Sequence, residues 1–256
     1  MSGEVVLETQ DLRKQFGSLV AVDDVSLSVE SDAITSIIGP SGAGKTTFYN
    51  LLTGALEPTG GEVHLRQDGE LREITGMAPH EIADRGLSRS YQITNVFEGL
   101  TVLENVLVAS ISNEGRSLEM LSRATQQEDL RERAWEVIEL ANLTDVADAE
   151  CSTLSHGEKR NVEIALALAI DPSVVLLDEP TAGMNPTETE RTAQLVSRLD
   201  DETDTTFVLT EHDMDVVVNI SDRIAVLDDG QLIADGPPEA VMEDETVTEA
   251  YLGGER

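Results

Sequence analysis

Aromatic residues and cysteine are scarce in this sequence, and the two shortages exclude an aromatic-rich core and internal cysteine cross-links or cysteine-cluster metal sites. Phe, Trp and Tyr make up 3% of the 256 residues while hydrophobic residues make up 40%, so the core must consist mainly of Val, Leu, Ile and Ala. The single cysteine, Cys151, excludes an internal disulfide and a cysteine-cluster metal site, in keeping with a reducing compartment. We expect Cys151 to be a small buried apolar residue.

Long apolar runs are also missing. A membrane-spanning helix needs roughly 18 to 20 consecutive apolar residues, and the longest candidate, near Ile164–Ile170, is far shorter. The N-terminus lacks the basic start and the apolar block of an export signal. These absences predict a cytoplasmic protein that reaches a membrane only through a partner.

Positive charge is the third shortage. The net charge is -33 at pH 7, lysine occurs only at Lys14, Lys45 and Lys159, and residues 1–128 and 129–256 carry -10 and -23. Such acidity keeps a protein hydrated in concentrated salt, which screens its self-repulsion. We therefore expect a salt-adapted cytoplasm, with an ordinary acidic protein as the alternative. Nucleic-acid binding is not expected, because it needs Lys and Arg to neutralise phosphates.

Apolar patterns along the chain predict an α/β fold. Short apolar runs in the first thirty residues predict antiparallel strands, and residues 33–38 predict a buried strand. Helical spacing marks residues 101–143, where Leu130, Ala134, Val137, Ile138 and Ala141 form one face, and residues 155–170. Later strands alternate with helical stretches, which indicates a mostly parallel sheet. These strands are predicted at residues 174–177, 207–210 and 224–227, with a hairpin turn at Asp228-Asp229-Gly230.

A phosphate-binding loop follows the buried strand. It fits G-x-x-x-x-G-K-[ST] and leads into a predicted helix that Gly54 ends; its residues are Gly39-Pro40-Ser41-Gly42-Ala43-Gly44-Lys45-Thr46. The glycines allow backbone N–H groups to curl around phosphate oxygens, and the helix N-terminus adds partial positive charge. We expect Lys45 to reach the β- and γ-phosphates and the Thr46 hydroxyl to ligate Mg²⁺. Together with Thr47, the loop forms the expected ATP site.

Two carboxylates end the predicted strand at residues 174–177. Asp178 and Glu179 stand where a parallel sheet presents acids at its ligand-binding edge. In isolation such a pair could be a solvated turn. Beside a phosphate loop, Asp178 is expected to hold Mg²⁺ through water, and Glu179 to orient or deprotonate the water that attacks the γ-phosphate.

A third segment indicates which family of phosphate-loop proteins this chain resembles. It precedes Asp178 and reads Leu154-Ser155-His156-Gly157-Glu158-Lys159-Arg160. This segment resembles the signature of the ABC ATPase family, usually L-S-G-G-Q, with His156 in place of the first glycine and Glu158 in place of the glutamine. The resemblance implies that Ser155 and Gly157 contact ATP held by a facing subunit.

Further residues occur in the order of that family. The resemblance implies that Phe16 stacks on adenine, that Gln92 senses Mg²⁺ and the attacking water, and that His212 contacts the γ-phosphate. An imidazole at the end of a strand can donate a hydrogen bond to a phosphate oxygen, whereas Phe16 and His212 taken alone would be packing residues. Ala182-Gly183-Met184-Asn185-Pro186 stands where the family has its D-loop, with Asn185 at a position commonly held by Asp.

The resemblance covers nearly the whole chain. It implies one ABC ATPase domain over residues 1–256, with a P-loop NTPase core and an antiparallel β layer in residues 1–90 and 171–256, and an inserted helical subdomain in residues 91–170. ATP and Mg²⁺ are the implied cofactors. Residues 89–92 and 100–106, together with the D-loop, look like those of the ATPases of branched-chain amino acid importers.

The same resemblance implies partners. Two ATPase subunits, identical or paralogous, would face each other head to tail. Transmembrane permease subunits would hold the chain at the inner face of the cell membrane, linked through the region of Gln92, and an extracytoplasmic substrate-binding protein would be an indirect partner. Two alternatives are a soluble ABC ATPase of a cytosolic assembly machine and a nucleotide-gated module without hydrolysis; intact Glu179 and His212 disfavour the second.

Overall fold

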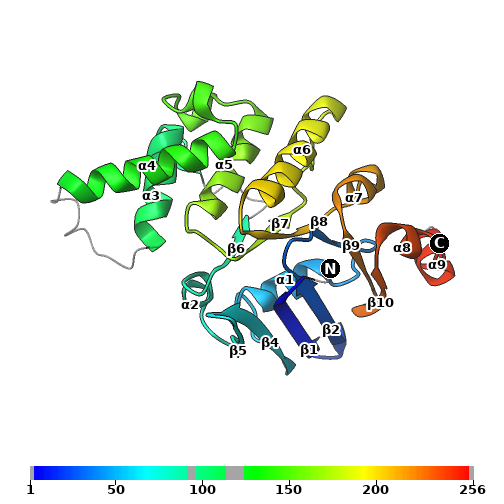
Figure 1. Ribbon diagram of the computed structural model, residues 1–256. Helices are drawn as coiled ribbons and strands as arrows, with labels where there is room; N and C mark the ends of the chain where they lie inside the picture. Colours follow the sequence, from blue (N-terminus) through cyan, green and yellow to red (C-terminus); the bar gives the residue numbers. More distant parts are fainter. Residues whose placement is uncertain (1–2, 91–95, 114–123, 254–256) are drawn as a thin grey trace.

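Two β-sheets with helices around them make up the described chain (Figure 1). The structure is a computed structural model that describes residues 3–90, 96–113 and 124–253. The smaller sheet has the strand order β2-β1-β4-β5, and the larger has the order β10-β9-β3-β8-β7-β6. This arrangement is the α/β fold with an antiparallel layer that the sequence predicts.

The smaller sheet is antiparallel throughout. Its strands are β1 (Val5–Phe16), β2 (Leu19–Glu30), β4 (Gly60–Gln67) and β5 (Glu70–Glu73). The short apolar runs of the first thirty residues belong to two long strands, because Asp11 and Asp24, with φ of 47° and 54°, interrupt the ladder without ending it. The sequence did not predict β4 and β5.

The larger sheet is parallel except at one edge. Its strands are β3 (Thr35–Ile38), β6 (Leu87–Ser90), β7 (Val174–Asp178), β8 (Thr206–Thr210), β9 (Arg223–Asp228) and β10 (Gln231–Gly236). Strand β10 pairs antiparallel with β9 across a turn in which Asp229 and Gly230 have φ of 44° and 80°. Two positive φ angles are typical of a tight hairpin, so the predicted hairpin is confirmed.

Helix α1 (Lys45–Leu52) lies between the two sheets, while α5 (His156–Leu168) and α6 (Pro186–Glu202) cover the far face of the larger sheet (Figure 1). Successive side chains of a strand point to opposite faces. In β7, Leu176 therefore packs in the core around α1, and Leu177 packs in the core beneath α5 and α6. Both faces are covered, which explains why this strand is apolar from Val174 to Leu177.

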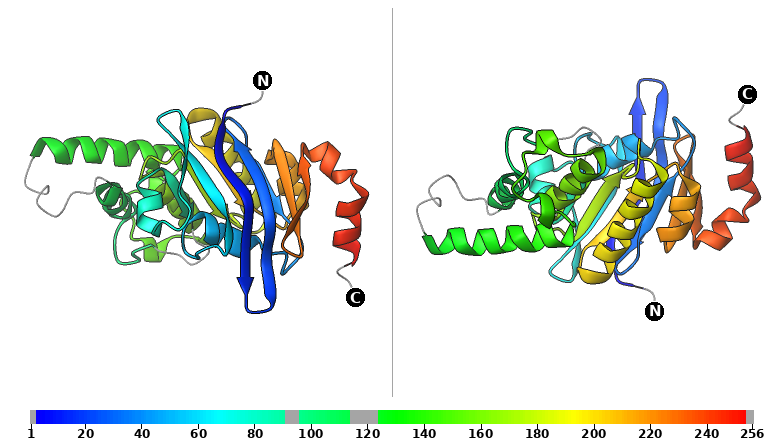
Figure 2. Two further views of the ribbon diagram at one scale, coloured as in Figure 1. Left: turned by 90° about the horizontal axis from the view of Figure 1, so that it is seen from below. Right: turned by 90° about the horizontal axis from the view of Figure 1, so that it is seen from above.

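Helices α3 (Val102–Asn113), α4 (Ala124–Leu140) and α5 gather at one end of the molecule (Figure 2). Ala134 and Ile138 of α4 are fully buried in a separate apolar core, and this confirms the predicted helical face. Cys151 is buried in the same core, as expected, and burial raises the pKa of its thiol. The subdomain boundaries at residues 91 and 170 stay a prediction.

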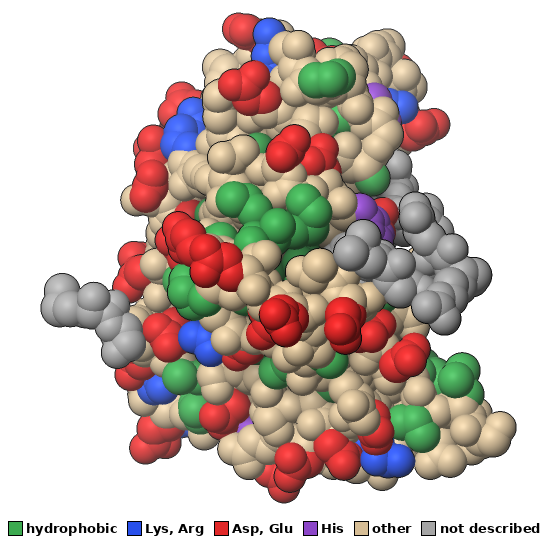
Figure 3. All heavy atoms as spheres, turned by 90° about the vertical axis from the view of Figure 1, so that its right-hand side faces the viewer, with side chains coloured by type: hydrophobic (Ala, Val, Ile, Leu, Met, Phe, Trp, Pro, Cys, Tyr) green, Lys and Arg blue, Asp and Glu red, His purple; other side chains and the backbone are tan. Residues whose placement is uncertain are grey.

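The remaining described α-helices are α2 (Pro79–Ala83), α7 (Met214–Ile220), α8 (Pro238–Met242) and α9 (Glu245–Gly253), and two short 3-10 helices span Thr144–Val146 and Cys151–Thr153. Helices α8 and α9 lie at the end opposite α4 (Figure 2). The face seen from this end carries many Asp and Glu side chains and few Lys or Arg (Figure 3). Within the described ranges, every helix is too short or too polar to cross a membrane.

Asp200, near the C-terminal end of α6, has a strongly perturbed carboxyl group. Partial burial raises its pKa from the usual 3.8 to about 6, and the carboxylates of Asp222, Asp201 and Asp32 add to the rise. The folded chain therefore holds this proton more tightly than the unfolded chain does. Consequently, the contribution of Asp200 to the free energy of unfolding falls as the pH rises from 3.8 to about 6.

Asp200→Asn is expected to stabilise the fold at pH 8 by about 1 kcal/mol, a figure kept small because the side chain is partly solvated. The gain should be smaller at pH 5, where the wild-type carboxyl is largely protonated in the folded state. Thermal unfolding at both pH values measures the difference. Asp148→Asn, which removes an exposed carboxylate, is the control; equal gains at both pH values would contradict the expectation.

Candidate functional site

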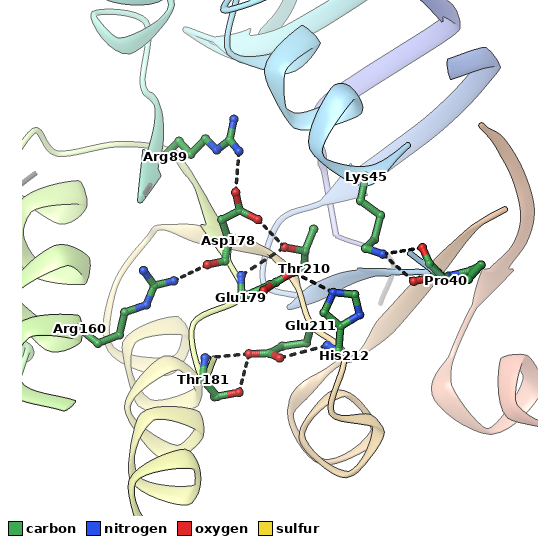
Figure 4. Close-up of polar contacts among 11 residues, drawn as sticks. Pro40, Lys45, Arg89, Arg160, Asp178, Glu179, Thr181, Thr210, Glu211 and His212 are labelled. Carbon is green, nitrogen blue, oxygen red and sulfur yellow. Dashed lines mark hydrogen bonds and ion pairs between the residues drawn. The ribbon is translucent and has the colours of Figure 1, made fainter. Parts of the chain in front are cut away.

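The carboxyl ends of β3, β7 and β8 meet at one edge of the larger sheet. Residue Thr210 of β8 pairs with Asp178 of β7 on one side and with Ile37 of β3 on the other. The chain segments that leave these strands therefore start side by side. They carry the phosphate loop after β3, Glu179 after β7 and His212 after β8 (Figure 4).

The phosphate loop takes a backbone path that requires glycine. Gly39, Gly42 and Gly44 have φ of 150°, 86° and 100°. A Cβ atom on Gly39 would lie 2.0 Å from the carbonyl oxygen of Leu227, and one on Gly44 would lie 2.3 Å from that of Ala21. The loop backbone therefore passes too close to β9 and β2 for a side chain at these positions, and glycine allows this close approach.

Helix α1 starts without a side-chain cap. Gly44 is its N-cap, and the first turn contains no acidic residue. The N–H groups at the start of a helix need acceptors, and their partial positive charge favours anions. A phosphate group therefore fits this end of α1.

Lys45 places its ammonium group within the loop. Its Nζ donates to the carbonyl oxygens of Gly39 at 2.5 Å and Pro40 at 3.1 Å. Burial lowers the pKa of Lys45, and the carboxylates of Glu179 and Asp178 partly offset this effect. A bound triphosphate would add negative charge next to the ammonium and would favour its ionised form.

Asp178 has a defined partner on each carboxylate oxygen. Its Oδ2 accepts from Nη2 of Arg89 at 2.6 Å, and its Oδ1 accepts from the hydroxyl of Thr210 at 2.9 Å. Hard oxygen donors suit Mg²⁺, which keeps several of its waters in nucleotide sites. With Arg89 in place, Asp178 fits a water-mediated contact to the metal, and the exposed Thr46 hydroxyl at the start of α1 fits direct ligation.

Glu179 and His212 meet side chain to side chain. Nε2 of His212 lies 2.8 Å from Oε1 of Glu179, and the two side chains are 52% and 24% exposed. Glu179 has a φ of 46°, an uncommon value for a residue with a side chain. Its backbone N–H donates to the carbonyl oxygen of Thr210 at 3.0 Å, which fixes the turn.

Other predicted site residues lie elsewhere. Phe16 is at the end of β1 and 45% exposed, on the hairpin whose second strand contacts Gly44 through Ala21. Ser155 is the exposed N-cap of α5, and the described hydrogen bonds of its side chain join it to Glu158. Gly157 follows in the first turn of α5. Gln92 lies outside the described residues.

The three departures from the usual motifs have local structural roles. Glu158 completes a capping box with Ser155, and these hydrogen bonds lower the pKa of its carboxyl. Asn185 caps α6 by accepting from the N–H groups of Thr187 and Glu188. His156 brings its Nε2 within 3.3 Å of the carbonyl oxygen of Ala182, which joins the start of α5 to the segment after Glu179.

Three charged residues around the site were not predicted as site residues. Arg89, at the end of β6, also donates to Oδ1 of Asn50 at 2.7 Å. Arg160 of α5 donates to the carbonyl oxygens of Pro180 at 3.2 Å and Asp178 at 2.6 Å. Glu211 is buried between Thr210 and His212. The sequence signal for these three residues was a charged side chain next to a motif. Such a signal does not tell which residue the side chain contacts in the folded chain.

Comparisons with known proteins agree with this geometry. A family model described as ABC transporter matches residues 22–182, and one described as branched-chain amino acid ATP-binding cassette transporter matches residues 231–256. The high-affinity branched-chain amino acid transport ATP-binding protein BraF of Pseudomonas aeruginosa is 41% identical in an alignment of 254 residues that covers 97% of this chain and 98% of that protein.

Solved structures agree as well. The ADP conformation of an ATP-binding cassette of an ABC transporter matches with a TM-score of 0.85 and 33% identity, over 99% of this chain and 99% of that chain. A dimeric cassette in a post-hydrolysis state, bound to ADP and Pi, matches with a TM-score of 0.74 and 29% identity, over 91% and 98% of the two chains. The chain therefore belongs to the ABC transporter family.

Proposed function

We propose that this chain is the ATP-hydrolysing subunit of an importer of branched-chain amino acids. The observation that carries the hydrolytic part is the meeting of Lys45, Asp178, Glu179 and His212 at one sheet edge. The transport part is supported by the likeness to named transport proteins over nearly the whole chain and by the family match at residues 231–256.

Each residue of the site has a proposed task. Lys45 and the N–H groups at the start of α1 bind the β- and γ-phosphates, and Phe16 stacks on the adenine. Thr46 and Asp178 hold Mg²⁺, which when bound neutralises phosphate charge. Glu179 orients or deprotonates the attacking water, and Nε2 of His212 donates a hydrogen bond to the γ-phosphate. Gln92, outside the described residues, keeps its predicted role as a sensor of the metal and the water.

The signature segment serves a second subunit. Ser155 and Gly157 lie at the start of α5, and their described contacts do not join them to the phosphate loop of the same chain. A facing subunit, identical or paralogous, would supply its own phosphate loop and ATP to these residues. The similarity to a dimeric cassette supports such a pair.

Transport also needs membrane partners. Permease subunits would hold the chain at the inner face of the cell membrane and would receive the closing and opening of the ATPase pair. An extracytoplasmic substrate-binding protein would deliver the amino acid. Nucleic acid is not a proposed partner, because the net charge of -33 opposes phosphate binding outside the loop.

The net charge also supports a salt-adapted cytoplasm. Acidic side chains repel one another in dilute buffer, and concentrated salt screens this repulsion. Unfolding by heat in 0.1 M and in molar KCl tests the idea, with a higher midpoint expected in molar KCl. Equal midpoints would favour an ordinary acidic protein.

Reconstitution tests the proposed function. The chain is coexpressed with the permease and ATPase genes that neighbour its own, purified as a complex in concentrated salt, and placed in liposomes with the binding protein. ATP-dependent uptake of radiolabelled leucine is expected. A complex that hydrolyses ATP but takes up a different solute would correct the substrate. If no membrane partner copurified with the chain, that result would favour a cytosolic assembly ATPase. The similarity to transport proteins argues against this alternative.

A further inference from the structure

Glu211 is a buried carboxylate between two residues of the site. It follows Thr210 of β8, precedes His212, and is 3% exposed. A buried carboxylate is costly unless hydrogen bonds replace its lost water. Its described partners are all hydrogen-bond donors of the backbone or of a hydroxyl group, so the contacts of Glu211 join segments of the chain to one another.

Both carboxylate oxygens of Glu211 are used, each toward a different segment (Figure 4). Oε1 accepts from the backbone N–H of Thr181 at 2.8 Å and from its hydroxyl at 2.7 Å. Oε2 accepts from the backbone N–H of His212 at 3.1 Å. Only a carboxylate can accept on both sides, since an amide would present one oxygen and one donor group.

The segment that Glu211 holds is the turn that contains Glu179. This turn closes where the N–H of Ala182 donates to the carbonyl oxygen of Glu179 at 3.1 Å, and Thr181 lies within it. Helix α5 holds the same turn from the other side, through Arg160 at the carbonyl of Pro180 and His156 at the carbonyl of Ala182.

We propose that Glu211 is a positioning residue for ATP hydrolysis: by joining Thr181 to the backbone of His212, it sets the separation between the side chains of Glu179 and His212. The inference rests on the proposed roles of those two residues. Glu211 acts through both, because one of its oxygens holds the turn of Glu179 and the other holds the residue that carries the imidazole. Its described contacts do not include the phosphate loop, so we expect Glu211 to affect hydrolysis far more than nucleotide binding.

Glu211→Gln tests the proposal, because it keeps the size of the side chain and removes one acceptor. We expect kcat for ATP hydrolysis to fall roughly ten- to a hundredfold, the cost of a small misplacement of reacting groups. The KM for ATP should change less than about twofold, because the phosphate loop is proposed to supply most of the contacts to the nucleotide. Glu243→Gln, which removes an exposed carboxylate of the same type near α8, should keep the wild-type kcat. The thermal midpoint reports folding separately.

A double-mutant cycle separates positioning from general stability. In the His212→Ala background, Glu211→Gln should lower kcat by a clearly smaller factor than in the wild type, because residues that act together are not additive. Fully additive losses, a wild-type kcat in Glu211→Gln, or a raised KM with unchanged kcat would each overturn the proposal. If the wild-type chain itself does not hydrolyse ATP, the roles of Glu179 and His212 fail, which is a different result from a fully active Glu211→Gln.

Discussion

Glu179→Gln is expected to bind ATP with nearly wild-type affinity while kcat falls by a factor of roughly 10² to 10⁴, the usual contribution of a general base. The amide keeps the size of the side chain but cannot accept a proton from the attacking water. We expect ATP bound between the two proposed subunits to hold them together until it is hydrolysed, so the variant should accumulate as an ATP-locked dimer. Phosphate release measures turnover, and light scattering with and without ATP measures the dimer.

The control for this variant is again Glu243→Gln, whose exposed carboxylate lies outside the site. It should show wild-type turnover and should return to monomers once ATP is consumed. Unimpaired hydrolysis by Glu179→Gln would remove Glu179 from the catalytic role. A variant that neither hydrolyses nor binds ATP would indicate that the substitution disturbs the turn held by Thr210 and Glu211, and not the chemistry alone.

Lys45→Ala should act one step earlier, by weakening nucleotide binding itself. The ammonium is proposed to contact the β- and γ-phosphates, and loss of a charge-assisted contact costs about ten- to a hundredfold in affinity. Without nucleotide, Lys45→Ala should lose little free energy of unfolding. Burial already disfavours the charged form of Lys45, as its lowered pKa indicates.

Equilibrium binding of a fluorescent ATP analogue, together with thermal unfolding without nucleotide, measures both effects. Arg72→Gln removes an exposed cation from β5 and serves as the control, with unchanged affinity expected. If Lys45→Ala bound the analogue as tightly as the wild type, the assignment of the phosphate loop would be contradicted. A large loss of stability without nucleotide would show instead that Lys45 is a packing residue.

Predictions from the sequence worked best where the signal is local. Helix α1 begins inside the phosphate loop and ends at Leu52, just before Gly54, whose φ is 69°; the sequence predicts both ends to within one residue. Strand β7 was predicted because Val174 to Leu177 are all apolar, a run that burial on both faces of a sheet requires. By contrast, β4 and β5 were missed, because they sit in a half-solvated layer where polar residues interrupt the apolar pattern.

In the candidate site, too, some features could be predicted from the sequence and others depend on the tertiary structure. The sequence by itself determined which side chains could handle a triphosphate, because the loop of Lys45 and the acids after β7 are continuous runs whose chemistry depends on neighbouring residues. Only the tertiary structure decided how those side chains are held. Arg89 reaches Asp178 across 89 positions of the chain and Glu211 reaches Thr181 across 30. Such contacts arise from the pairing of parallel strands and from burial, and a local pattern of residues does not encode them.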